Sequence, residues 1–239
     1  MGGDNGDLVK PTIEIRPSGI AVVRDNFENG LNSHIWLTRK IEPGRLTFLN
    51  LDGISAARIE IHEGDRREVN ESSKATERDE LLEQKALQLP VGVNVWYAFS
   101  FYFPPDFPLL DNRTVFAQWK QKDERASPFL SLRYQKGELF CRVAGDEINK
   151  KFRLPQLREL RGQWHRIKMN YLLNPNLTGR VRCKLDGEEF VNYEGELGHS
   201  SLGPSTYFKM GLYRDQIETP QTICLAQYRR GPTEKDCEI

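Results

Sequence analysis

The sequence has no long apolar run, no excess charge of either sign and little cysteine. No stretch of about eighteen consecutive apolar residues occurs, so no transmembrane helix is predicted. Lys plus Arg and Asp plus Glu each total 34, so net charge predicts no binding of nucleic acid or of an anionic membrane. The start, MGGDNGDLVKPT, lacks the basic and apolar segments of a signal peptide, which leaves the compartment open.

The few cysteines show no ligand spacing for a structural metal. Cys141, Cys183, Cys224 and Cys237 form no CxxC or Cys/His pattern, so no zinc site is predicted. The first three lie inside strand-like runs, which favours small buried residues, with a disulfide as the alternative.

Short apolar runs separated by turn signals extend through the sequence without any repeat. This pattern is typical of an all-β protein, an antiparallel β-sandwich, and we expect one domain over residues 1–239 with its core at about 20–231 and peripheral termini. Asp186 and Gly187 separate two alternating runs and predict a tight hairpin. Strands are expected at 56–62, 95–103, 114–120, 129–134, 139–143, 165–171, 180–185, 207–213 and 222–228.

Helix has little room in this pattern. The strongest helical signal is ESSKATERDELLEQKAL, residues 71–87, and its many charges leave a loop at the rim as the alternative. One short helical turn is expected within 154–160.

Several expected strands have one apolar face and one polar face. Side chains alternate along a strand, so at 207–213 Phe208, Met210 and Leu212 are expected in the core, with Tyr207, Lys209 and Tyr213 on the other face. On the other strands, the residues expected to face the core are Val115, Ala117, Trp119, Leu130, Leu132, Tyr134, Ile59 and Ile61. The residues expected on the opposite face are Phe116, Gln118, Lys120, Ser131, Arg133, Arg58, Glu60 and His62. Amide, guanidinium, ammonium and phenol groups together suit a carboxylated, hydroxyl-rich ligand, whereas the alternative is an ordinary solvated face.

Three motifs in this pattern carry a family resemblance. ERDEL at 77–81, AQWK at 117–120 and YFKMGLYR at 207–214 resemble, in order, the three sequence blocks of jelly-roll polysaccharide lyases. Those blocks run R-S/T-E-L, Q-I/V-H and Y-F-K-x-G-x-Y. The surrounding RIEIHEGD, GQWHRIKMNY and KLDGEEFVNYEG are more similar to the branch that holds heparin lyase I and glucuronan lyase. The resemblance covers about residues 25–231.

The resemblance implies β-elimination at a uronic acid of an acidic polysaccharide in a concave groove. Gln118 and Arg78 match the donors that neutralise the uronate carboxylate, and Tyr213 matches the tyrosine that serves as base, acid or both. A free tyrosine has a pKa of about 10, so a basic tyrosine needs nearby cations such as Lys209, Lys120 or Arg133. The expected substrate-binding residues are Lys120, Lys209, Arg58, Glu80, Arg133 and Tyr207.

The sequence departs from the family pattern at two places. Lys120 stands where the family has histidine, which leaves Tyr213 in both roles or His62 as a further base; His165 matches a position that looks structural. Ala226 stands where related proteins hold a calcium-binding aspartate, so structural calcium is in doubt. Asp25 and Glu28 remain candidate cation ligands or plain turn formers. No cofactor is expected for catalysis. The family implies a secreted or periplasmic protein, and we expect a monomer.

Two other functions fit the same fold. A non-catalytic glycan-binding module would keep the groove and lose the chemistry through changes such as Lys120. A glycoside hydrolase of laminarinase type would need paired carboxylates on one strand, as in E-x-D-x-x-E, and the sequence has no such strand.

Overall fold

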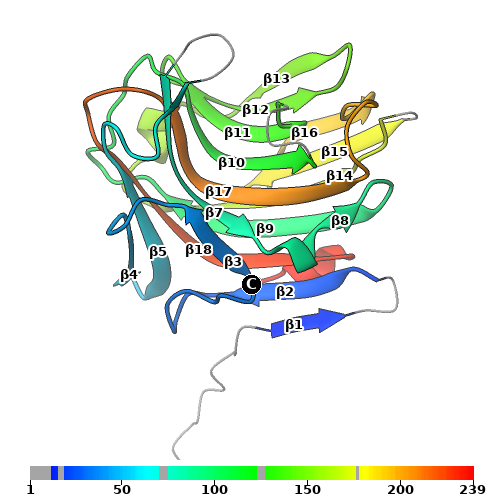
Figure 1. Ribbon diagram of the computed structural model, residues 1–239, viewed down its shortest axis with the longest axis horizontal. Helices are drawn as coiled ribbons and strands as arrows, with labels where there is room; N and C mark the ends of the chain where they lie inside the picture. The colour runs from blue at the N-terminus through cyan, green and yellow to red at the C-terminus, as the bar shows by residue number, and fades with distance from the viewer. Residues whose placement is uncertain (1–11, 16–18, 70–74, 123–126, 176–177) are drawn as a thin grey trace, which may run out of the picture.

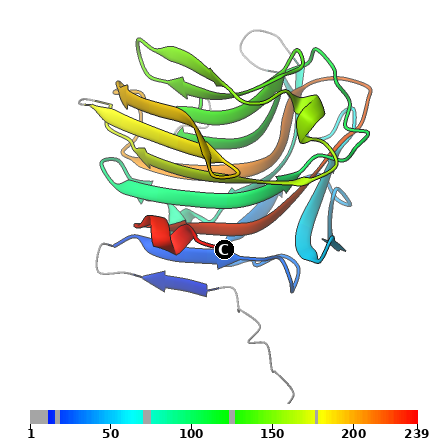
Figure 2. The same cartoon turned by 180° about the vertical axis from the view of Figure 1, so that it is seen from behind.

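The protein folds into two antiparallel sheets, A and B, packed face to face (Figures 1 and 2). The computed structural model describes residues 12–15, 19–69, 75–122, 127–175 and 178–239. Within them, each sheet has nine strands. This arrangement confirms the predicted antiparallel sandwich.

Sheet A runs β1-β2-β18-β9-β14-β15-β16, with β5 beside β18 and β4 beside β5. Its strands are β1 (Thr12–Ile15), β2 (Ala21–Asp25), β4 (Leu46–Leu51), β5 (Ile54–Ile61), β9 (Asn94–Tyr102), β14 (Trp164–Leu172), β15 (Gly179–Leu185), β16 (Glu188–Gly195) and β18 (Gln221–Gly231).

Sheet B runs β13-β12-β11-β10-β17-β7-β3, with β6 beside β7 and β8 beside β17. Its strands are β3 (Trp36–Lys40), β6 (Glu68–Val69), β7 (Ala75–Glu83), β8 (Leu89–Pro90), β10 (Thr114–Gln121), β11 (Leu130–Gln135), β12 (Glu138–Ala144), β13 (Asn149–Arg153) and β17 (Ser205–Asp215). Three short 3-10 helices, η1 (Lys85–Leu87), η2 (Leu157–Leu160) and η3 (Glu234–Cys237), complete the described elements.

A cluster of aromatic rings fills the space between the sheets. Phe208 of sheet B lies 4.7 Å from Trp119 and 5.3 Å from Tyr97, centroid to centroid, and stacks on Tyr228 at 5.8 Å. Such rings bury large apolar areas and hold the two sheets in one relative position. All four cysteines are buried free thiols, as expected for Cys141, Cys183 and Cys224.

The nine expected strands are confirmed, as are the hairpin and the short turn. Asp186 and Gly187 take φ values of 50° and 90° between β15 and β16, and η2 lies in the expected place. Both turn residues have the positive φ that a tight hairpin requires. Within the described residues, no helix has the length and hydropathy to span a membrane.

The predicted helix at 71–87 is wrong, because its centre forms strand β7. Residues 70–74 lie outside the described residues, and η1 is the helical part that remains. Alternation along β7 turns Glu77 toward the interior, where Arg214 of β17 pairs with it at 2.8 Å and both side chains are 0% exposed. Acidic residues that helical spacing assigns to a solvated surface are instead inward-facing members of a strand.

Val115 and Phe116 lie on the opposite faces from those expected, because β10 has a β-bulge between Val115 and Ala117. The pairing register shifts between Val115 and Ala117 against both neighbouring strands. Phe116 therefore packs in the core, 5.2 Å from Phe101, and Val115 pairs with Tyr213. The extra residue of a bulge changes the side on which the following side chains lie, which strict alternation does not anticipate.

Candidate active site

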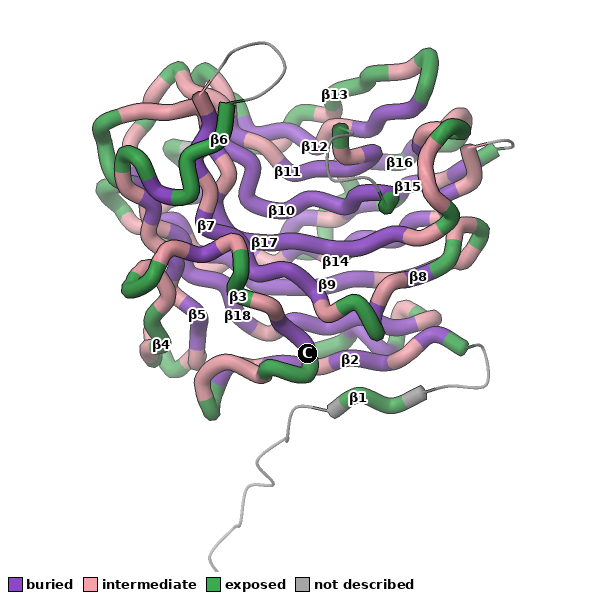
Figure 3. Tube along the Cα trace, in the orientation of Figure 1, coloured by how far each residue is buried: buried purple, intermediate pink, exposed green. Residues whose placement is uncertain are grey.

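The polar residues gather on the face of sheet B that is turned away from the core, which we call the outer face of sheet B. Lateral pairing aligns Lys209 of β17 with Gln118 of β10, then Ser131 of β11 and Arg142 of β12. A parallel row joins Arg78, Tyr213, Val115, Arg133 and Phe140. The central strands β10 and β17 are buried over most of their length (Figure 3). The polar side chains on these strands are therefore packed against neighbouring residues.

Tyr213 lies between two guanidinium groups. The Cζ atoms of Arg78 and Arg113 each lie 4.7 Å from the centroid of its ring. Arg113 Nη2 donates to Asp215 Oδ1 at 2.7 Å. Burial acts against this charge, but Asp215 more than offsets it and raises the pKa of Arg113. Two cations are thus held against one phenol ring.

Sequence reasoning missed Arg113 and Asp215. Arg113 precedes the first residue of β10 and Asp215 ends β17, so neither belongs to a matched motif. The one signal is their position at neighbouring strand ends, where the Asp215 backbone N–H donates to the Arg113 carbonyl at 3.0 Å.

Gln118 is held by a buried carboxylate on the same face. Its amide Nε2 donates to Glu80 Oε1. Glu80 Oε2 lies 3.8 Å from Lys209 Nζ and 3.9 Å from Arg78 Nη1. A primary amide has two N–H groups, so one remains to meet a ligand after the bond to Glu80. The cations around Glu80 offset its negative charge.

Lys120 and Tyr207 extend the outer face of sheet B toward β8. They pair across β10 and β17, and both are buried at 6% exposure. Lys209 Nζ lies 5.7 Å from the centroid of the Tyr207 ring. Beyond Tyr207 is a hollow of about 230 Å³ with Leu37 and Leu82 on its wall and Arg39, Lys85 and Lys122 around it. The hollow offers apolar and cationic groups side by side.

Arg133 lies across β10 from Tyr213. Its Nε donates to Ser131 Oγ at 2.7 Å. Burial, with the charges of Arg142 and Arg113 nearby, lowers the pKa of Arg133 to about 9. The site therefore contains several cations that disfavour one another's charge.

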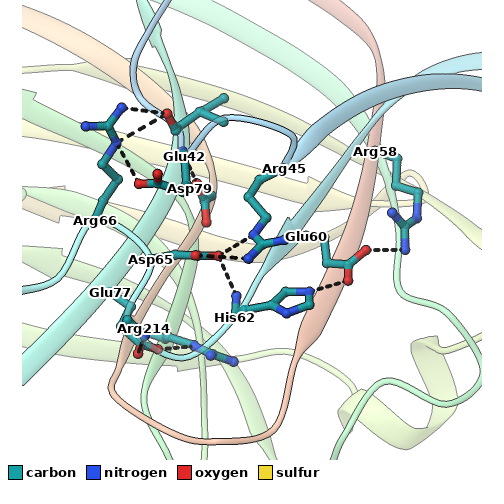
Figure 4. Close-up of polar contacts among 12 residues, drawn as sticks. Glu42, Arg45, Arg58, Glu60, His62, Asp65, Arg66, Glu77, Asp79 and Arg214 are labelled. Atoms are coloured by element: carbon teal, nitrogen blue, oxygen red, sulfur yellow. Dashed lines mark hydrogen bonds and ion pairs between the residues drawn. The ribbon is translucent and has the colours of Figure 1, made fainter.

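The structure does not bring Arg58 and His62 to this face. Arg58 lies on β5 of sheet A, with His62 directly after that strand, and both contact the Glu60 carboxylate, Arg58 Nη2 at 2.6 Å (Figure 4). The hydrogen bond from His62, followed by that from Arg58, lowers the pKa of Glu60. Alternation identifies the polar face of a strand but not the sheet to which the strand belongs.

His165 and the candidate cation ligand Asp25 make hydrogen bonds to nearby residues. His165 Nδ1 lies 2.6 Å from Asp186 Oδ2, beside the hairpin. Asp25 accepts hydrogen bonds from the Phe27 backbone N–H at 2.9 Å and from Trp36 Nε1 at 2.8 Å, one on each oxygen. Each Asp25 oxygen thus accepts one hydrogen bond, and Ala226 offers no side-chain oxygen. Among the described residues, no group of three His, Cys, Asp or Glu side chains could hold a metal ion.

The fold is the jelly roll found in several solved lyases and glucanases. The endo-β-1,4-glucuronan lyase of the fungus Trichoderma reesei is similar in structure, with a TM-score of 0.65 and 17% identity over 87% of this chain and 94% of that one. Alginate lyase PA1167 of Pseudomonas aeruginosa has a TM-score of 0.55 and 16% identity over 85% of this chain and 100% of that one. A β-glucanase of Bacillus licheniformis has a TM-score of 0.57 and 9% identity over 89% of this chain and 98% of that one. At these identities the likeness shows the fold alone.

The sequence itself assigns the family. The polysaccharide lyase family matches residues 27–227, most of the chain. The protein therefore belongs to the polysaccharide lyase family, which confirms the resemblance, and its substrate is a polysaccharide. No curated protein sequence matches it.

Proposed function

We propose that the protein cleaves a uronate-containing polysaccharide by β-elimination on the outer face of sheet B. The observation that carries this proposal is Tyr213 between Arg78 and Arg113, on the strand that pairs with Gln118. A proton acceptor and donors for a carboxylate thereby lie on one face of adjacent strands.

The reaction follows from these groups. Gln118 and Arg78 donate hydrogen bonds to the uronate carboxylate, which makes the C5 proton more acidic and stabilises the enolate-like intermediate. The oxygen of Tyr213 takes the C5 proton, and Arg78 and Arg113 stabilise the negative charge on the phenol during the transfer. The electron pair forms the C4–C5 double bond as the C4–O4 bond breaks. The leaving O4 then receives a proton, and Tyr213 is the candidate donor.

Lys120 occupies the motif position of the family histidine on the same face. It is buried beside Tyr207 and is a candidate contact for the carboxylate or for the leaving group. We propose no catalytic metal, and no step above passes through one. We further propose that the protein acts as a monomer outside the cytoplasm, in line with an extracellular polymer as substrate.

The test compares Tyr213→Phe with Tyr102→Phe, the same change on β9 of sheet A. Wild type and Tyr102→Phe should generate ultraviolet absorbance from the unsaturated uronate on glucuronan, alginate or heparin. Tyr213→Phe should lose this activity and keep polymer binding in affinity gel electrophoresis. Wild-type turnover by Tyr213→Phe would refute the role of Tyr213. Binding by wild type without absorbance on any polymer would indicate a glycan-binding module, and new reducing ends without absorbance would indicate a glycosidase.

A further inference from the structure

Two arginines on the outer face of sheet B are bound only to neutral groups. Arg133 Nε donates to Ser131 Oγ at 2.7 Å. Arg142 donates through Nε to Asn149 Oδ1 at 2.8 Å and through Nη1 to the carbonyl of Pro128 at 2.9 Å. Within the described residues, neither guanidinium has a carboxylate at ion-pair distance.

Two fully buried arginines of this protein have an acidic partner, whereas Arg161 and Arg229 donate to backbone carbonyls. Arg214 pairs with Glu77 at 2.8 Å, and Arg230 pairs with Glu83 at 2.9 Å, all with side chains no more than 1% exposed. A charge taken out of water is costly unless an opposite charge meets it. Arg133 shows that cost, because burial and its cationic neighbours Arg142 and Arg113 lower its pKa to about 9. An anion bound beside Arg133 would reduce the free-energy cost of its buried charge.

The register places these two arginines beside the proposed reaction centre. Gln118 pairs with Ser131, and Ser131 pairs with Arg142, so Arg142 lies two strands from Gln118, about 10 Å away. The Arg133 side chain reaches Ser131 between them. A polysaccharide that crosses the strands would pass Arg133 and Arg142 within about two sugars of the uronate at Gln118.

The surroundings of Arg142 continue the positive charge. Lys151 of β13 pairs with Arg142, and its Nζ lies 4.7 Å from the ring centroid of Phe140, the lateral neighbour of Arg133. Arg133, Arg142 and Lys151 therefore occupy neighbouring positions on strands β11, β12 and β13. Guanidinium groups match the two-oxygen geometry of carboxylates and sulfates.

We propose that Arg133 and Arg142 form a second anion-binding subsite, which takes a carboxylate or sulfate from a sugar other than the one that is cleaved. This inference rests on the proposed function for the identity of the polymer. The subsite sets affinity and substrate length, and it takes no part in proton transfer.

The kinetic test uses Arg142→Gln, Arg133→Gln and the matched control Arg182→Gln, an exposed arginine on β15 of sheet A. On glucuronan hexasaccharides, Arg142→Gln and Arg133→Gln should each raise KM about tenfold or more with little change in kcat, since a charge-assisted hydrogen bond is lost. Disaccharides, too short to fill both places, should respond much less. Arg142→Lys should recover part of the loss. Equal KM values for Arg142→Gln and Arg182→Gln, or equal losses on short and long substrates, would overturn the proposal.

A binding test separates this inference from the proposed function. In the Tyr213→Phe background, affinity gels with glucuronan or with heparin report binding without turnover. Loss of retardation by Arg142→Gln on glucuronan identifies a carboxylate subsite, and loss on heparin alone identifies a sulfate subsite. Unchanged retardation on both polymers overturns the subsite. If wild type cleaves no uronate polymer, the proposed function fails while these gels still decide the subsite.

Discussion

Asp79 makes the stability of strand β7 depend on pH, and substitution by asparagine should remove that dependence. The residue lies between Arg78 and Glu80 in sequence but on the opposite side of the strand. Its Oδ1 accepts the backbone N–H of Glu42 at 2.6 Å, and Asp65 lies beside it (Figure 4). Burial, together with the charge of Asp65, raises the pKa of Asp79 to about 8. Burial opposes ionisation of Asp65 as well, but Arg45, with a hydrogen bond of 2.6 Å, lowers the pKa of that carboxyl. The pair therefore holds one proton, on Asp79, at neutral pH.

The magnitude follows from linkage. Between pH 5 and pH 7 the folded protein holds the Asp79 proton and the unfolded chain does not, so the free energy of unfolding falls as pH rises. The full effect is about 1.4 kcal/mol per pH unit, or about 2.7 kcal/mol over this range. Partial solvent screening reduces it to about 1–2 kcal/mol. An asparagine at 79 can donate to Asp65 and accept from Glu42 at every pH, so it mimics the protonated acid.

Urea unfolding at pH 5, 6 and 7 tests this reasoning on wild type, Asp79→Asn and the control Asp106→Asn, which lies in an exposed turn. The free energy of unfolding of Asp79→Asn should exceed that of wild type by an amount that grows by about 1–2 kcal/mol from pH 5 to pH 7. Asp106→Asn should follow wild type. Parallel pH profiles for wild type and Asp79→Asn would refute the assignment of the proton to Asp79.

Two further substitutions probe the support of the outer face of sheet B. Arg214→Met leaves the Glu77 carboxylate buried without its partner and should destabilise the fold by about 3–5 kcal/mol in urea unfolding, whereas a loss under about 1 kcal/mol would contradict the pairing. Gly211 has φ 141°, and an added Cβ would lie 2.3 Å from the Asp79 carbonyl oxygen. Gly211→Ala should therefore cost about 1–3 kcal/mol more than Gly53→Ala, where φ is also positive, at 83°, but no atom lies within 4 Å. Equal thermal shifts for the two glycine variants would show that β7 tolerates the displacement.

The sequence predicts the two faces of β17 and β11 because alternation along a regular strand is a local property. Tyr207, Lys209 and Tyr213 lie on one face as expected, while Phe208 and Met210 lie in the core. The same reasoning separates Arg133 from its inward neighbours. Here the period of two holds over the whole strand, so the face follows from the sequence.

The remaining positions depend on properties that are not local. Arg58 and His62 have the expected polar surroundings, but the pairing of β5 with β18 places them on the other sheet. The bulge at Val115 arises only when β10 meets its neighbours, and Arg113 reaches Tyr213 from outside any motif. Strand order and register decide these contacts, and they emerge only when distant segments pair.

The zero net charge of the chain conceals a separation of charge across sheet B. Glu77 and Glu83 are turned inward from β7, where Arg214 and Arg230 neutralise them. Glu80, on the outer face of sheet B, is held by Gln118 and lies near Lys209. These carboxylates, which would repel a polyanion, are thus buried beside cations, while Arg133 and Arg142 on the outer face have no carboxylate at ion-pair distance within the described residues. Binding of an acidic polysaccharide therefore depends on the side of each strand on which a charge lies. The net charge of the whole sequence does not reveal this distribution.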